Sequence, residues 1–315
     1  MSLAISFVRL SQPMTVSPAD YFSFNARAPF LYRPLLPALL SWMPVDFQSC
    51  RVGLNVPLDT CANVAALALD GTFLFVTCLC VWSAMSVVAE RVGRHPDWGI
   101  PAALLALWMA TACFVLPPNR ILYYAYDSLD LAFVAVGVML ATRWRRRGAL
   151  LLIPLTFLAA FNKETAVFIP ISVLVFAFFM RQIDRRLLVC SGLAAIATPL
   201  AKPLSVAFIQ WKLGTTVPAN LFELQLLGNL RQLTNPLMWL AWGSAMGGAL
   251  LALLLLPSLD PHVRKLRRVV VAIVVVWFGV IMVVGMAREM RLLAPLIPVV
   301  VLAVTALLWD FLGDP

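Results

Sequence analysis

Nine apolar stretches separated by short polar loops constrain this chain more than any other feature of its sequence. About 20 apolar residues are enough for a helix to cross a bilayer. Only 12% of the residues are charged and 62% are hydrophobic, whereas soluble domains carry about 25% charged residues. The sequence therefore predicts an all-α polytopic transmembrane bundle of about nine spans. We place these spans at about 63–89, 99–116, 124–142, 149–161, 165–180, 187–209, 237–257, 269–286 and 292–310.

Basic residues gather in four of the loops between the apolar stretches, at 90–97, 143–147, 181–186 and 262–268. These loops alternate along the chain with less basic ones, so the positive-inside rule assigns them to the cytoplasm. The net charge of +9 is then a topology signal, and no nucleic-acid-binding motif accompanies it. We expect the N-terminus outside, the C-terminus in the cytoplasm, and an outer loop at 210–236.

Residues 1–62 are too polar and too rich in proline to span a membrane. Their amphipathic stretches predict an interfacial segment on the outer face, with Phe30, Tyr32 and Trp42 as its aromatic anchors. Cys50 and Cys61 flank a polar loop in this region. A disulfide requires that this loop face an oxidising compartment, and the spacing alone does not decide between a disulfide and two thiols. With only two histidines and no Cys-x-x-Cys motif, the residues predict no zinc site.

Two charged residues interrupt the apolar sequence "LAAFNKETAVFIPI" at 158–171, namely Lys163 and Glu164. Ionised side chains at membrane depth are costly and usually face a polar cavity. The flanking stretches, 149–161 and 165–180, are short for a hydrocarbon core of about 30 Å. They predict a hairpin whose tip lies below the outer surface, with both charges in a recess. Neighbouring residues on a helix do not face each other, so we expect each to have a partner elsewhere. A purely structural ion pair at a tight turn is the alternative.

Further polar residues fall on the same predicted side. Tyr123, Asp127 and Asp130 lie at positions i, i+4 and i+7, which share one helical face. Asp127 also suits the first turn of a helix, where a carboxylate complements the helix dipole. Asp20 precedes them in a stretch of aromatic residues and prolines at 17–37, where the apolar interface gives a carboxylate no advantage.

Arginines complete the set of candidates. Arg33 lies in the same N-terminal stretch as Asp20, and Arg288 and Arg291 lie one turn apart at a predicted outer helix end. The planar guanidinium binds two phosphate oxygens at once, so such residues suit a phosphate ligand. The alternative is that these arginines only extend their charged heads to the membrane surface.

The chain resembles the GT-C class of membrane glycosyltransferases. The segments that carry the resemblance are "RAPFLYRPLLPALL", "YYAYDSLDLAFVAVGVMLATR", "LAAFNKETAVFIP" and "REMRLLAPLIP", in this order and on one side of the membrane. The resemblance implies transfer of a sugar from a polyprenyl-phosphate donor to a glycan, lipid or protein acceptor. It also implies that the reaction takes place on the outer face of the bacterial inner membrane.

The resemblance implies roles for the candidate residues as well. Asp20 would be the catalytic base, and Lys163, Arg288 and Arg291 would hold the lipid phosphate. Glu164 and Asp127 would orient these cations or the sugar, with Glu164 as the organiser of Lys163. The remaining substrate-binding candidates are Arg33, Tyr123 and Asp130. A divalent cation is left open, and no other cofactor is implied.

The chain departs from the family at its N-terminus. Members usually begin with a membrane helix ahead of the first outer loop, and residues 1–62 contain no such helix. We expect either that the first span inserts unaided or that a preceding helix is encoded upstream. The alternative functions are a carrier or flippase for lipid-linked sugars and an assembly partner without chemistry of its own.

Overall fold

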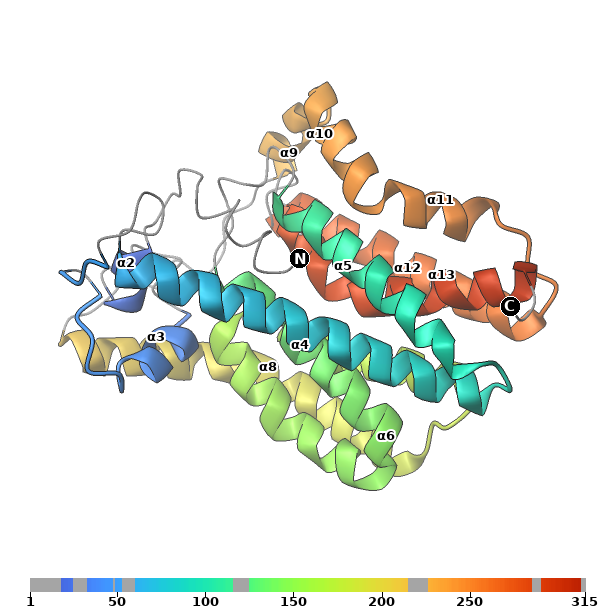
Figure 1. The fold of residues 1–315 in the computed structure, drawn as a ribbon, viewed down its shortest axis with the longest axis horizontal. Helices are drawn as coiled ribbons and strands as arrows, with labels where there is room; N and C mark the ends of the chain where they lie inside the picture. Colours follow the sequence, from blue (N-terminus) through green and yellow to red (C-terminus); the bar gives the residue numbers. More distant parts are fainter. Residues whose placement is uncertain are drawn as a thin grey trace.

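The computed structural model describes residues 18–24, 33–47, 49–52, 60–115, 125–214, 226–284 and 290–312. Within these ranges the chain is helical, and the β-type pairing is limited to one isolated bridge between Arg51 and Thr60. Figure 1 shows the helices as an elongated bundle, with the long helices running roughly along one direction.

Five helices among the described residues are long and apolar enough to cross a membrane. By helix length and composition, the prediction of a helical integral membrane protein is confirmed. The helices that contain these stretches are α4 (Cys61–Arg91), α5 (Gly99–Val115), α8 (Arg185–Leu213), α12 (Pro261–Val284) and α13 (Ile297–Leu312). Short 3₁₀ turns, η2 (Pro96–Trp98) and η6 (Met290–Leu296), precede α5 and α13.

The remaining helices are shorter or interrupted. The predicted span at 237–257 corresponds to α10 (Pro236–Trp242), a π-helical turn, η5 (Gly243–Gly247), and α11 (Gly248–Leu255). Outside the long bundle lie α2 (Pro18–Phe22), α3 (Leu35–Leu40) and α9 (Leu226–Gln232).

Helix α6 (Ala125–Asn162) doubles back on itself. A straight helix would separate Tyr126 from Asn162 by about 54 Å, at 1.5 Å per residue. Instead, the Asn162 amide donates a hydrogen bond to the Tyr126 carbonyl at 2.8 Å. A Cβ atom added to Gly148 would collide with the backbone of Leu140, so the chain reverses between these residues. The arginine-rich stretch at 143–147, which the sequence predicts as a loop, therefore lies at this bend.

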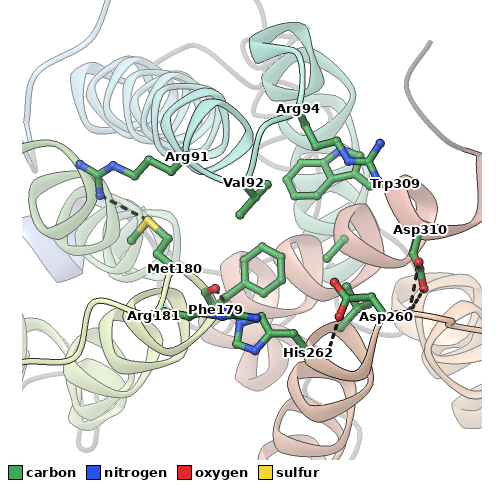
Figure 2. Close-up of a pocket in the computed structure, with 12 residues that line it drawn as sticks. Arg91, Val92, Arg94, Phe179, Met180, Arg181, Asp260, His262, Trp309 and Asp310 are labelled. Carbon is green, nitrogen blue, oxygen red and sulfur yellow. Dashed lines mark hydrogen bonds between the residues drawn. The ribbon is translucent and has the colours of Figure 1, made fainter.

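Basic loops meet at one end of the bundle. Arg91 donates to Gln182 at 2.7 Å, and the His262 ring donates to the Phe179 carbonyl at 2.7 Å. The first contact joins the loops at 90–97 and 181–186, and the second joins the stretch at 262–268 to Phe179, just before the loop at 181–186. Figure 2 shows Arg91, Arg181 and His262 at this end of the bundle. The charge pattern assigns these three loops to one side. In Figure 1 this end lies on the right, and the N-terminal helices α2 and α3 lie at the opposite end.

The N-terminal segment packs on the bundle through its own small core. Tyr21, Phe22 and Leu36 are buried against Ala66 of α4 and Tyr126 of α6. The main core lies between the long helices, and α13 is enclosed more completely than the other candidate spans. Trp42 is 89% exposed, which fits its predicted role as an interfacial anchor. The other two predicted anchors, Phe30 and Tyr32, lie outside the described residues.

Candidate functional site

The candidate site is built around the break between α6 and the next helix. Asn162 ends α6, Lys163 is extended at φ −163° and ψ 148°, and Glu164 begins the 3₁₀ turn η4 (Glu164–Val167). The short helix α7 (Phe168–Phe179) follows. One extended residue between two helical segments sends adjacent side chains in different directions. As a result, Lys163 is buried and Glu164 is exposed.

Lys163 forms a buried ion pair with the start of α6. Its ammonium nitrogen lies 2.9 Å from Asp127 Oδ1, and the two side chains are 2% and 0% exposed. One turn further along α6, Asp130 accepts a hydrogen bond from the Thr165 hydroxyl at 2.5 Å. The two carboxylates on one helical face thus hold the hairpin tip. Both carboxylates are buried, so the face that the spacing predicted for them is an interior one.

Glu164 has different partners. Its Oε1 atom lies 2.5 Å from the Lys202 ammonium, and its Oε2 atom lies 3.9 Å from the Arg33 guanidinium. The expectation that the two charges at the tip have separate partners is confirmed. Of the two carboxylates expected to orient the cations, Asp127 contacts Lys163, whereas Glu164 contacts Lys202 and Arg33.

The cluster of Arg33, Glu164 and Lys202, hereafter the charged trio, is partly open to solvent. The three side chains are 13%, 53% and 23% exposed. Arg33 also lies over the Tyr126 ring, with its guanidinium carbon 4.5 Å from the ring centroid. This is a cation–π arrangement, which fixes the guanidinium without neutralising it.

The charged trio lies well below the end of α8. This helix continues past Lys202 to Leu213, a rise of about 16 Å. The hairpin tip is therefore recessed relative to α8, as its short flanking helices predicted.

The N-terminal segment covers the same region. The Tyr21 hydroxyl donates to the Arg33 carbonyl at 2.9 Å, and its ring lies 5.4 Å from the Tyr126 ring. Burial raises the pKa of the Tyr21 phenol well above its usual value, so the hydroxyl stays protonated as a donor. Phe24 reaches Phe208 of α8, with 6.4 Å between ring centroids. The segment thus extends from the start of α6 to α8, and Asp20 lies half-buried on it.

Three predicted site residues are not described at the level of their side chains. Tyr123 and Arg288 lie outside the described residues, and only the backbone of Arg291 is described, within η6. Their predicted roles stay predictions.

Lys202 is the residue that the sequence reading missed. It stands alone in the apolar stretch 187–209, between Pro199 and Pro203. The same cost of a charge at membrane depth that singled out Lys163 applies to it. A search for every isolated charge inside the predicted spans would have found it.

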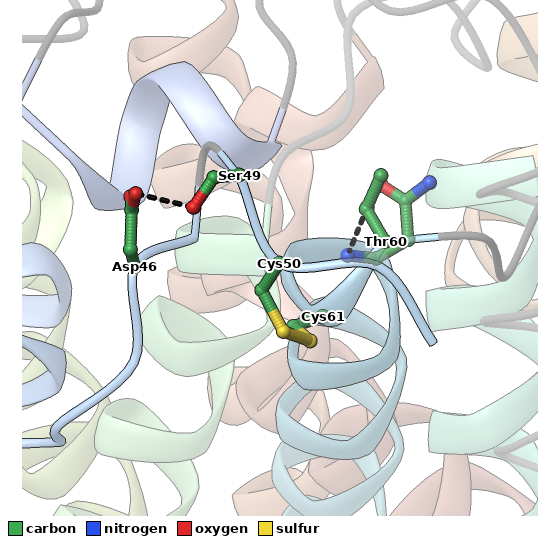
Figure 3. Close-up of a disulfide and its surroundings, with 6 residues drawn as sticks. Asp46, Ser49, Cys50, Thr60 and Cys61 are labelled. Atoms are coloured by element: carbon green, nitrogen blue, oxygen red, sulfur yellow. Dashed lines mark hydrogen bonds between the residues drawn. A yellow bond between two sulfur atoms is a disulfide. The ribbon is translucent and has the colours of Figure 1, made fainter. Parts of the chain in front are cut away.

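A disulfide links Cys50 to Cys61, with 5.5 Å between the Cα atoms (Figure 3). The spacing left open either a disulfide or two free thiols, and the structure has the disulfide. The bridge fastens the N-terminal segment to the first residue of α4. The Thr60 side chain caps this helix by accepting from the Asn63 amide at 3.1 Å.

The donor set does not resemble a protein metal site. Among the residues that the structure describes, no group of three or more His, Cys, Asp or Glu side chains could hold a metal ion. What the arrangement offers is two partly exposed cations held by one carboxylate, which suits an anionic ligand.

No protein family, no curated protein and no solved structure matches this chain. The fold and the site define its class as a helical integral membrane protein with a recessed polar site at the end away from its basic loops.

Proposed function

We propose that this protein is a glycosyltransferase of the GT-C kind, which transfers a sugar from a polyprenyl-phosphate donor on the outer face of the bacterial inner membrane. The observation that carries the proposal is the charged trio, which is recessed and partly exposed. It lies beside the end of α6 at Asn162, away from the arginine-rich bend at 143–147. In this proposal the chain crosses the membrane nine times, with its N-terminus outside and its C-terminus in the cytoplasm.

The phosphate of the donor is the leaving group, so positive charge beside it lowers the barrier. Lys202 and Arg33 supply that charge, and Glu164 holds both cations in position before the donor binds. Lys163 is proposed as a structural residue and no longer as a phosphate ligand, because its charge is buried against Asp127. Arg288 and Arg291 stay proposed phosphate ligands.

Asp20 is the proposed general base. Its carboxylate takes the proton from the acceptor hydroxyl as that oxygen attacks the anomeric carbon. The bond from this carbon to the phosphate oxygen breaks, and its electron pair leaves with the lipid phosphate. The position of Asp20 supports this role, because the neighbouring Tyr21 is bonded to the backbone of Arg33.

The Cys50–Cys61 disulfide supports the orientation. Disulfides persist in oxidising compartments such as the bacterial periplasm. This one lies at the start of α4, whereas Arg91 at the other end of the same helix belongs to the basic loops. The disulfide and the charge pattern therefore assign the same side to the site.

Sugar transfer in isolated membranes tests the proposal, with a radiolabelled polyprenyl-phosphate sugar as donor. Asp20→Asn should lower the rate by about 10²-fold or more, and Lys202→Gln by about 10²–10³-fold. Lys212→Gln is the matched control, because it removes the same charge from an exposed position of the same helix, and it should leave the rate unchanged.

Full transfer by both Asp20→Asn and Lys202→Gln, at normal expression, would refute the assignment of the site. Movement of the labelled lipid across the membrane without a new glycosidic product would instead identify a carrier.

A further inference from the structure

A second polar site lies at the opposite end of the bundle, among the basic loops (Figure 2). It is a pocket of about 350 Å³ at the ends of α4, α7 and α13 and the start of α12. Its cationic lining residues are Arg91, Arg94 and Arg181, from two different loops. The positive-inside rule explains why arginines occur at this end, but it does not require that they surround one pocket.

The two carboxylates in the pocket are engaged by backbone amides. Asp310 Oδ2 accepts from the Leu259 and Asp260 amides at 2.7 and 3.2 Å. Asp260 Oδ1 accepts from the His262 amide at 2.7 Å. Three guanidinium groups and two carboxylates leave a positive balance in the lining. The acids therefore also order the loop before α12, and the arginines outnumber them in the pocket lining.

Arg181 occupies a backbone conformation that favours glycine. Its φ is +54°, and it follows α7 in a turn that is closed by the Gln182 amide bonded to the Ala177 carbonyl at 2.8 Å. Helices commonly end with glycine at such a position, and a long side chain such as arginine is strained there. Strain of this kind persists where a side chain is needed. No described residue forms a hydrogen bond or ion pair with the exposed Arg181 side chain.

The geometry points to a binding site for a phosphate group in this pocket. Arginine forks match phosphate oxygens in pairs. The apolar lining beside them, including Phe179 and Trp309, suits the carbon atoms next to the phosphate. The ligand is thus an organic phosphate, either the headgroup of an anionic phospholipid or a soluble phosphate monoester. This site does not depend on the proposed transferase activity.

Native mass spectrometry of the full-length protein in detergent tests the site. One arm adds phosphatidylglycerol or phosphatidylcholine, and the other adds glycerol 3-phosphate. We expect phosphatidylglycerol or glycerol 3-phosphate to bind, and the double variant Arg94→Gln, Arg181→Gln to bind about tenfold or more weakly. Arg264→Gln, which removes a charge at the same end but outside the pocket, should bind as the unmodified protein does.

The two arms identify the source of the phosphate. Selective retention of phosphatidylglycerol that glycerol 3-phosphate does not displace identifies a lipid headgroup, and binding of glycerol 3-phosphate alone identifies a soluble phosphate. Arg181→Gly relieves the strained backbone, so it should raise the melting temperature while it weakens binding by about tenfold. Equal losses in the Arg264 and Arg181 variants, or no binding in either arm, would overturn the proposal.

Discussion

The buried pair of Lys163 and Asp127 gives the sharpest test of the structure. Both side chains are almost fully enclosed, so the removal of one leaves an uncompensated charge inside the protein. Such a loss costs about 3–5 kcal/mol. Lys163→Met should be the more damaging change, because Lys163 also acts electrostatically on Asp130 and its loss leaves two neighbouring carboxylates. In Asp127→Asn, by contrast, Lys163 keeps Asp130 as a neighbouring carboxylate.

Thermal unfolding of the purified protein in detergent measures the effect. At about 2 °C per kcal/mol for a chain of this size, Lys163→Met should lower the melting temperature by about 6–10 °C. The double variant Lys163→Met, Asp127→Leu should recover most of this loss, because an apolar pair of similar volume often replaces a buried ion pair at little cost. A double-mutant cycle then gives the coupling between the two residues.

The pair of Lys202 and Glu164 is the matched comparison. Its ammonium nitrogen and carboxylate oxygen are also in direct contact, but both side chains are partly exposed. Lys202→Met should therefore lower the free energy of unfolding by about 1 kcal/mol or less. The reasoning is refuted if Lys163→Met and Lys202→Met shift the melting temperature equally, or if the double variant is no better than Lys163→Met alone.

Three further outcomes are expected. The Cys50→Ser, Cys61→Ser variant should lose about 2–3 kcal/mol of unfolding free energy, as the short loop between the cysteines predicts, which lowers its melting temperature by about 4–6 °C. If the unmodified protein melts at the same temperature under reducing and oxidising conditions, the disulfide is contradicted. Gly99→Ala should lower the melting temperature by about 2–6 °C, because the new Cβ would lie 2.7 Å from the Trp82 carbonyl oxygen; a neutral result would contradict this close approach. A cysteine at the exposed Trp42 position, with the native cysteines replaced, should react with a membrane-impermeant maleimide in intact cells, and labelling only after permeabilisation would reverse the proposed orientation.

Much of the fold is predictable from the sequence because membrane spans are local features. Each predicted stretch corresponds to a helical segment, and α12 alone begins well before its predicted start at 269. Apolar composition marks only the part of a helix that lies in the membrane. The basic residues at 262–268 continue the same helix beyond that part, so α12 begins earlier than the apolar stretch. The recess at the hairpin tip was also predictable, since it follows from helix lengths.

The partners within the site were not predictable. Lys163 and Asp127 are 36 positions apart in the sequence, and no periodicity links two arms of a hairpin across its bend. The contact of Arg33 with Glu164 depends on how the N-terminal segment folds over the bundle. Composition describes this segment as interfacial, but it does not say which side chains turn inward.

The closed hairpin of α6 has a consequence for how the chain enters the membrane. Its two arms are adjacent in the sequence. Two polar contacts fasten the ends of these arms, one from Asn162 to Tyr126 and one from Lys163, directly after the helix, to Asp127. A charge that enters hydrocarbon alone costs about 2.5–3.5 kcal/mol on insertion scales, whereas a paired lysine and aspartate can enter as a neutral unit. We therefore expect the two arms to insert together during synthesis, so that the site's foundation is complete before Lys202 leaves the ribosome.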